Sequence, residues 1–178
     1  PYITTDYSES LLELITPATT SIAETLGFLD DLHRFIYAHL GNEELWVNSM
    51  PCILGDDNSI PLAQYGHSNI GRMKTLYRHG LGVRYGRRMQ TIAGIHYNLS
   101  FPDSFWQAWQ EKLGNTQSLA DFRSEKYFGL VRNFQRRSWL LLYLLGASPA
   151  VCGSFLRGRE HKLQECGRGT LYLPNATS

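Results

Sequence analysis

The stretch Thr91-Ile-Ala-Gly-Ile-His-Tyr-Asn-Leu-Ser-Phe101 carries the clearest strand pattern in this sequence of 178 residues. Its alternation gives one apolar face, made of Ala93, Ile95, Tyr97, Leu99 and Phe101. The opposite face is more polar and carries Ile92, Gly94, His96, Asn98 and Ser100. Such a pattern is typical of an antiparallel strand that covers a core on one side. We therefore predict that His96 and Asn98 face an accessible site, while Ile95, Tyr97 and Leu99 pack beneath helices.

The segment before this strand predicts one further strand, one hairpin and one helix. Residues 10–15, Ser-Leu-Leu-Glu-Leu-Ile, alternate as a strand does. Ser21 and Glu24 form a capping box before apolar residues at helical spacing, which predicts a helix from about 21 to 40. Residues 52–54 and 60–62 flank a turn of Gly, Asp and Asn and predict the hairpin.

The segment after the strand predicts helices. A short helix is expected over 104–112, and one or two helices over 119–145. The sequence Gly146-Ala-Ser-Pro149 ends them, because proline cannot continue a helix. Strands and helices together predict an α+β fold, and the length suits a single domain over residues 1–178.

The composition is that of a globular protein, with 43% hydrophobic, 12% aromatic and 19% charged residues. The longest apolar run, Trp139 to Leu145, is far shorter than the roughly 20 residues of a membrane helix. The three cysteines are an odd number without C-x-x-C spacing, and no signal segment opens the chain. We expect a cytoplasmic protein with no membrane partner.

Charge is unevenly distributed along the chain. Residues 1–57 carry a net charge of −9, residues 58–102 carry +6, and the remainder carries +4. Carboxylates suit Mg²⁺ and arginines suit anions, so this combination favours phosphoryl-transfer chemistry. A first alternative is that these charges belong to solvated helix faces. A second is a polyanion-binding module built on the basic stretch 72–88, in which Tyr77 and Tyr85 are interleaved.

Short segments that run in order along the whole chain carry a family resemblance. They are Thr5-Asp-Tyr-Ser-Glu-Ser-Leu-Leu-Glu-Leu-Ile-Thr-Pro17, Ser49-Met-Pro-Cys52, Leu62-Ala-Gln-Tyr-Gly66, Lys74-Thr-Leu-Tyr-Arg78, Met89-Gln-Thr-Ile92, Gly94-Ile-His-Tyr-Asn98 and Gly146-Ala-Ser-Pro-Ala150. This set resembles bacterial glutamate-cysteine ligase, the γ-glutamylcysteine synthetase of glutathione biosynthesis. The resemblance implies a glutamine-synthetase-like fold, in which an antiparallel sheet curves into a funnel with helices outside.

The resemblance also implies a reaction. ATP phosphorylates the γ-carboxylate of glutamate, and the amine of cysteine displaces the phosphate. Glutamate, cysteine and ATP are then the substrates, Mg²⁺ is the cofactor, and nucleic acid is not a partner. A related carboxylate-amine ligase that uses another amine is an open alternative.

Nine positions match family site residues. Asp6, Glu13 and His96 are implied as metal ligands. Being seven apart, Asp6 and Glu13 cannot share a face of one regular strand, so Asp6 is expected in the loop leading into the strand or beside a bulge. The implied substrate residues are Gln90, Ile92 through its backbone, and Asn98 for glutamate, and Tyr77, Arg78 and Leu81 for cysteine, with Arg78 also as the catalytic residue.

The family's chains extend much further on both sides. Their amino-terminal part brings a Glu-x-Glu pair to the metals, and their carboxyl-terminal part brings most of the ATP site. The resemblance therefore implies that residues 1–178 are the central part of a catalytic domain. It also implies that this part is inactive by itself and contains no assignable ATP contacts.

Overall fold

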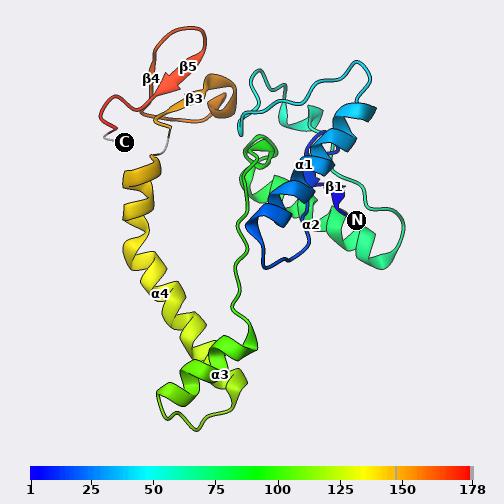
Figure 1. Cartoon of the computed structure of the whole chain (residues 1–178). Coiled ribbons are helices and arrows are strands. Elements are labelled where there is room, and N and C mark those ends of the chain that lie inside the picture. Colours follow the sequence, from blue (N-terminus) through cyan, green and yellow to red (C-terminus); the bar gives the residue numbers. More distant parts are fainter. Residues whose placement is uncertain (147, 177–178) are drawn as a thin grey trace. The chain divides into compact units, whose positions relative to one another are not determined.

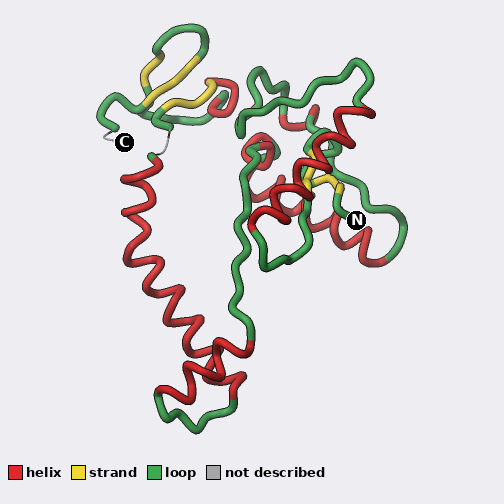
Figure 2. The backbone as a smooth tube through the Cα atoms, viewed as in Figure 1, coloured by secondary structure: helices red, strands yellow, loops and turns green. Residues whose placement is uncertain are grey.

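The computed structural model describes residues 1–146 and 148–176, which form two compact units. The first unit comprises Pro1–Gly94, Cys152–His161 and Gly167–Thr170. The second comprises the described residues of Ile95–Val151, Lys162–Cys166 and Leu171–Ser178. Figure 1 labels the elements, and Figure 2 shows that helices and loops make up most of the chain.

The first unit begins with a hairpin of β1 (Ile3–Thr5) and β2 (Leu12–Leu14). The strands are antiparallel and Thr4 pairs with Glu13. The strand predicted over residues 10–15 is thus confirmed in its central part.

The predicted helix near residues 21–40 is confirmed as α1 (Ile22–His39). The Ser21 hydroxyl accepts a hydrogen bond from the Glu24 N–H at 3.3 Å, as the capping box predicts. A second helix, α2 (Asn69–Tyr85), is capped in the same way by Ser68, whose hydroxyl accepts from the Gly71 N–H. It ends at Gly86, whose φ of 87° favours glycine.

The core of the first unit draws residues from widely separated segments. Its buried hydrophobic members are Tyr7, Ile36, Ile60, Ala63 and Phe155. Two arginines that follow α2 connect these segments by donating hydrogen bonds to backbone carbonyls. Arg87 donates to the Ile60 carbonyl at 2.9 Å, and Arg88 donates to the carbonyls of Gly55 and Ser154 at 3.1 Å. The side chain of Arg88 is only 12% exposed.

The prediction of a strand over residues 91–101 is wrong for this chain. Residues Arg88–Thr91 form the 3-10 helix η2, and the following residues run as an extended loop up to α3 (Figure 2). No described residue pairs with the backbone of residues 94–100. A strand needs a neighbour to satisfy its backbone groups. The side chains expected beneath helices are correspondingly exposed, with Ile95 at 93%, Tyr97 at 91% and Leu99 at 76%.

The hairpin predicted around residues 55–58 is also wrong. The 3-10 helix η1 (Asp57–Ser59) replaces the turn, and residues 52–54 form no strand. Leu62 instead makes an isolated antiparallel bridge with Ser8 of the β1–β2 turn. Pairing between distant segments has therefore replaced the local pairing expected from the sequence.

The second unit is built on α3 (Asp103–Lys112) and α4 (Leu119–Leu145), which confirms both predicted helical regions. Figure 1 shows α4 as one continuous helix, which ends at Gly146 as predicted. Buried Trp106 and Phe122 hold the two helices together, and Arg123 forms a 2.7 Å ion pair with Asp103. No helix in the described ranges is long and apolar enough to cross a membrane.

A small three-stranded sheet in the order β3-β5-β4 lies near the carboxyl end of the described chain. Its strands are β3 (Ala150–Cys152), β4 (Gln164–Glu165) and β5 (Thr170–Tyr172), and β4 and β5 are antiparallel. A 3-10 helix, η3 (Gly153–Leu156), follows β3. Helices combined with small antiparallel sheets confirm the α+β class.

Candidate functional site

The β1–β2 hairpin brings the predicted metal ligands Asp6 and Glu13 to one side of the sheet. Glu13 lies opposite Thr4, and paired residues of a sheet share a face. Asp6 follows Thr4 by two positions, and its N–H donates to the Leu11 carbonyl at 2.9 Å, which continues the register by one step. The two residues therefore lie diagonally across the hairpin. Asp6 stands just beyond β1, outside the regular strand, as predicted.

Two side chains fix the backbone at Asp6. The Tyr65 hydroxyl hydrogen-bonds to the Thr5 carbonyl at 2.6 Å and to the Asp6 carbonyl at 2.7 Å. Nε of Arg78 donates to the same Asp6 carbonyl at 2.6 Å, and its guanidinium lies 4.5 Å from the centre of the Tyr65 ring. The Asp6 backbone carbonyl and a guanidinium from α2 thus meet at one corner, which we call the Asp6 corner.

Tyr65 is a site residue to which the sequence analysis assigned no role. It lies in the segment Leu62-Ala-Gln-Tyr-Gly66, which contributed only to the family resemblance. The signal for Tyr65 in the sequence was an aromatic residue shortly before the basic stretch 72–88. Its contacts with Thr5 and Asp6 cross about 60 positions of sequence, so no local pattern reveals them.

The other predicted substrate residues of the first unit lie on α2 and η2. Tyr77 is exposed and Leu81 is half-buried, and their spacing of four places them on one face of α2. Gln90 belongs to η2 and Ile92 follows it. Arg87 and Arg88, which precede Gln90, anchor η2 to distant backbone carbonyls. Because Arg87 and Arg88 make these hydrogen bonds, fewer basic side chains of residues 72–88 remain free to bind a polyanion.

His96 and Asn98 belong to the second unit and are both exposed. Both side chains are accessible, as expected. Ile95 and Tyr97 are exposed as well, so the two faces of this segment do not differ in burial as predicted. Within the described residues, no three or more His, Cys, Asp or Glu side chains gather into a group that could hold a metal ion. The implied set of Asp6, Glu13 and His96 draws on both units and stays a prediction.

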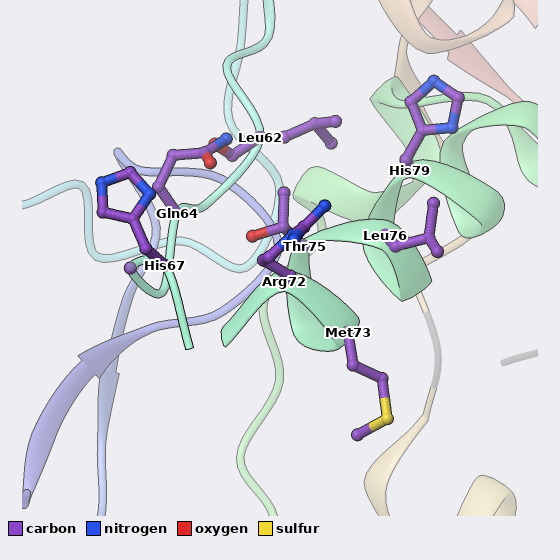
Figure 3. A pocket seen from close by; sticks show the side chains of 9 residues that line it. Leu62, Gln64, His67, Arg72, Met73, Thr75, Leu76 and His79 are labelled. Atoms are coloured by element: carbon purple, nitrogen blue, oxygen red, sulfur yellow. The ribbon is translucent and has the colours of Figure 1, made fainter. Parts of the chain in front are cut away.

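A pocket of about 510 Å³ opens beside α2 (Figure 3). Helix residues Arg72, Met73, Leu76 and His79 line it, together with residues of the preceding loop that include His67. None of the nine predicted site residues is among its lining residues. The pocket occupies the face of α2 that the spacing of 3.6 residues per turn places away from Tyr77 and Leu81.

Comparisons with known proteins give a consistent result over the whole chain. The family model described as glutamate-cysteine ligase matches residues 1–178. The glutamate-cysteine ligase of Alcanivorax borkumensis is 62% identical over 178 residues, which cover all of this chain and 34% of that protein. The corresponding protein of Hahella chejuensis is 56% identical and is covered to the same 34%.

A solved structure agrees with these relatives. The crystal structure of glutamate-cysteine ligase from Francisella tularensis in complex with AMP matches with a TM-score of 0.84 and 38% sequence identity. The match covers 99% of this chain and 34% of that chain. The chain thus spans about a third of the length of the relatives that it matches.

Proposed function

The chain belongs to the glutamate-cysteine ligase family, and from this premise we propose that it forms the central part of the catalytic domain of such an enzyme. The observation that carries the proposal is the family match over all of residues 1–178. Relatives extend well beyond the third of their length that this chain covers, so residues outside it complete the site. The curved, helix-backed sheet implied by the resemblance is proposed to form only with those residues.

The proposed reaction has two steps. The γ-carboxylate of glutamate attacks the terminal phosphorus of ATP, which releases ADP and leaves an acyl phosphate. The amine of cysteine then attacks the acyl carbon, phosphate leaves, and the amine proton passes to solvent or a base. The AMP bound in the Francisella structure supports an adenine nucleotide as one substrate.

The Asp6 corner fits part of a Mg²⁺ site. Mg²⁺ in phosphoryl-transfer enzymes is usually held by one or two carboxylates together with water and substrate phosphates. Asp6 and Glu13, on one side of the hairpin, supply two carboxylates of this kind, and His96 is proposed as a further ligand. When bound, Mg²⁺ would offset negative charge on the triphosphate.

We assign the remaining roles to residues of both units. Arg78 is proposed to contact the reacting groups, because its guanidinium lies at the Asp6 corner and arginine binds carboxylates and phosphates in a fork. Tyr77 and Leu81 on α2 are proposed to contact cysteine. Gln90, the backbone of Ile92, and Asn98 are proposed to hold the amino-acid head of glutamate.

A chimeric enzyme tests the proposed function. The segment of the Alcanivorax enzyme that aligns with this chain would be replaced by residues 1–178, which are 62% identical to it. We expect the chimera to release ADP only when both glutamate and cysteine are present, and mass spectrometry to detect γ-glutamylcysteine.

Two results would contradict the proposal. A folded chimera that binds Mg-ATP but makes no peptide would exclude the assigned activity. A chimera that accepts another amine far better than cysteine would favour the related carboxylate-amine ligase. The parent Alcanivorax enzyme is the control for amine specificity.

A further inference from the structure

The segment that precedes α2 runs along the turn of the β1–β2 hairpin. Leu62 forms the antiparallel bridge with Ser8, and the Ala63 N–H donates to the Tyr7 carbonyl at 3.0 Å. Tyr65 follows two positions after Ala63, so its backbone is held beside the hairpin.

Helix α2 packs directly on the backbone of Tyr65. Gly71, in the first turn of this helix, is buried, and a Cβ there would collide with the carbonyl oxygens of Tyr65 and Gly66. Glycine therefore permits the close approach of the helix. Thr75, about one turn further along, donates its hydroxyl to the Ala63 carbonyl at 3.1 Å. The backbone of Tyr65 is thus fixed by the hairpin on one side and by α2 on the other.

The side chain of Tyr65 contacts two of the candidate site residues. Its hydroxyl proton is shared between the carbonyl oxygens of Thr5 and Asp6, at 2.6 and 2.7 Å. Nε of Arg78 donates to the same Asp6 carbonyl, so both lone pairs of that oxygen are used. The centre of the Tyr65 ring lies 4.5 Å from the Arg78 guanidinium and 5.2 Å from Nζ of Lys74, both within the range of a cation–π interaction.

These contacts leave the reactive groups of the Asp6 corner free. Within the described residues, every hydrogen bond at Asp6 involves its backbone, and its exposed carboxylate has no hydrogen bond or ion pair. Nη1 of Arg78 donates to the Lys74 carbonyl at 3.2 Å, whereas Nη2 has no partner in the same part of the chain. A carboxylate that is held through its backbone can bind a cation without losing the contacts that orient it.

We propose that Tyr65 is a positioning residue for the reaction assigned above. Its hydroxyl fixes the backbone of Asp6 so that the carboxylate is oriented for Mg²⁺, and its ring holds Arg78 beside that carboxylate. The proposal rests on the proposed function, which supplies the metal and the substrates. Residues that orient a metal ligand from outside the coordination sphere affect metal affinity by about 10- to 100-fold. We expect the lower end of this range, because Tyr65 acts on the backbone of Asp6 and not on its carboxylate.

Tyr65→Phe in the chimera removes the hydroxyl and keeps the ring on which Arg78 lies. Mn²⁺, which prefers oxygen ligands as Mg²⁺ does, is the probe, and electron paramagnetic resonance measures its free concentration. We expect Tyr65→Phe to weaken Mn²⁺ binding about tenfold and to raise the Mg²⁺ concentration for half-maximal ligase activity by a similar factor. Activity at saturating Mg²⁺ should be largely restored, because the bound cation then holds the carboxylate in place.

Hydrogen exchange of the Asp6 amide measures the same contact without metal or turnover. This amide donates to the Leu11 carbonyl at 2.9 Å across the hairpin. In the 178-residue chain it should exchange about fivefold faster in Tyr65→Phe, because a hydrogen bond that holds the turn is lost. Tyr37→Phe is the matched control, since Tyr37 is exposed on α1, and it should leave exchange, Mn²⁺ binding and activity unchanged.

Unchanged Mn²⁺ affinity in a folded Tyr65→Phe chimera would overturn the proposal. A loss of activity that saturating Mg²⁺ does not restore would also overturn it, because Tyr65 would then serve only the stability of the fold.

Failure of the proposed function has a different signature. In that case the chimera without further substitution binds Mn²⁺ but makes no γ-glutamylcysteine. The comparison of Mn²⁺ affinities still tests Tyr65, because it needs no turnover. A chimera that binds no Mn²⁺ would overturn the metal assignment and, with it, the role proposed for Tyr65.

Discussion

At the scale of single residues, the position of Asp6 relative to Glu13 depends on the register of one hairpin. Seven positions separate them, and in one straight strand they would point to opposite faces. The turn between β1 and β2 reverses the chain, and the pairing of Thr4 with Glu13 returns both to one side. The spacing argument is correct for a strand but does not apply to a hairpin.

Glu13→Gln in the chimera should abolish ligase activity at low Mg²⁺ concentration. The amide keeps the shape of the side chain but loses the charge that attracts the cation. Without metal, this variant should be as stable as the parent or slightly more stable, because repulsion between Glu13 and Asp6 is removed. Steady-state kinetics over a Mg²⁺ titration and thermal melts in EDTA measure both effects.

Glu44→Gln is the control for this prediction, since Glu44 is an exposed acid in the loop after α1. It should retain activity and change the free energy of unfolding by less than about 0.5 kcal/mol, as ordinary surface substitutions do. Full activity of Glu13→Gln at low Mg²⁺ would show that Glu13 is not a ligand.

Tyr7→Phe should raise the free energy of unfolding of the chain by about 1 kcal/mol, because a buried hydroxyl without a partner is costly. The Tyr7 hydroxyl has no hydrogen-bond partner among the described residues. Burial also raises the pKa of Tyr7 above its ordinary value of 10.0. Above pH 10 the unfolded chain loses this proton first, so wild-type stability should fall with rising pH.

The loss of stability that Tyr7 causes at alkaline pH should be absent in Tyr7→Phe. Denaturant melts between pH 7 and 11 measure the difference between the two proteins. Tyr97→Phe, at an exposed tyrosine, is the control and should leave the wild-type pH dependence in place. A loss of stability in Tyr7→Phe at pH 7 would show that the hydroxyl is hydrogen-bonded.

At the scale of elements, α2 shows why a glycine pattern can serve packing. Gly80, Gly82 and Gly86 lie close to a dinucleotide-binding spacing but form no such motif. A Cβ at Gly82 would collide with the Tyr7 hydroxyl, whereas a Cβ at Gly80 would meet nothing within 4 Å. Gly82 therefore allows the buried Tyr7 of the β1–β2 turn to approach the helix.

Gly82→Ala should destabilise the chain by about 1 to 3 kcal/mol, since overpacking forces buried neighbours to shift. Gly80→Ala should stabilise it by up to about 1 kcal/mol, because alanine favours the helix and nothing opposes its methyl group. Denaturant melts compare the two. Tyr7→Phe should restore part of the loss in Gly82→Ala, and equal effects of both alanine variants would contradict the proposed contact.

At the scale of the whole molecule, two apolar stretches of the described chain remain exposed. Ile95, Tyr97 and Leu99 alternate along the extended segment after η2, and the end of α4 carries a run of exposed leucines. A concentration of exposed apolar side chains of this kind favours an interaction site. Because the chain covers 34% of its relatives, the remaining parts of a full-length enzyme are the expected partner of this surface.

Hydrogen exchange tests this expectation. Amides of residues 95–100 should exchange freely in the 178-residue chain and about tenfold or more slowly in the chimera, because strand pairing protects backbone amides. The 178-residue chain alone should also make no γ-glutamylcysteine. Equal exchange in both proteins would show that the segment is not a strand in the complete enzyme, and cysteine-dependent ADP release by the chain alone would show that it is not a fragment.

The sequence by itself determined several helices, one strand of the first hairpin and the family. Ser21 with Glu24 specified the start of α1, the apolar spacing before Gly146 specified α4, and motifs along the chain identified the glutamate-cysteine ligase family. These features depend on residues a few positions apart, so they are visible without a fold. Only the tertiary structure decided that Tyr65 and Arg78 hold Asp6 and that Gly82 admits Tyr7. These contacts join segments tens of residues apart, and the strand pattern of residues 91–101 likewise requires a partner strand that local sequence cannot supply.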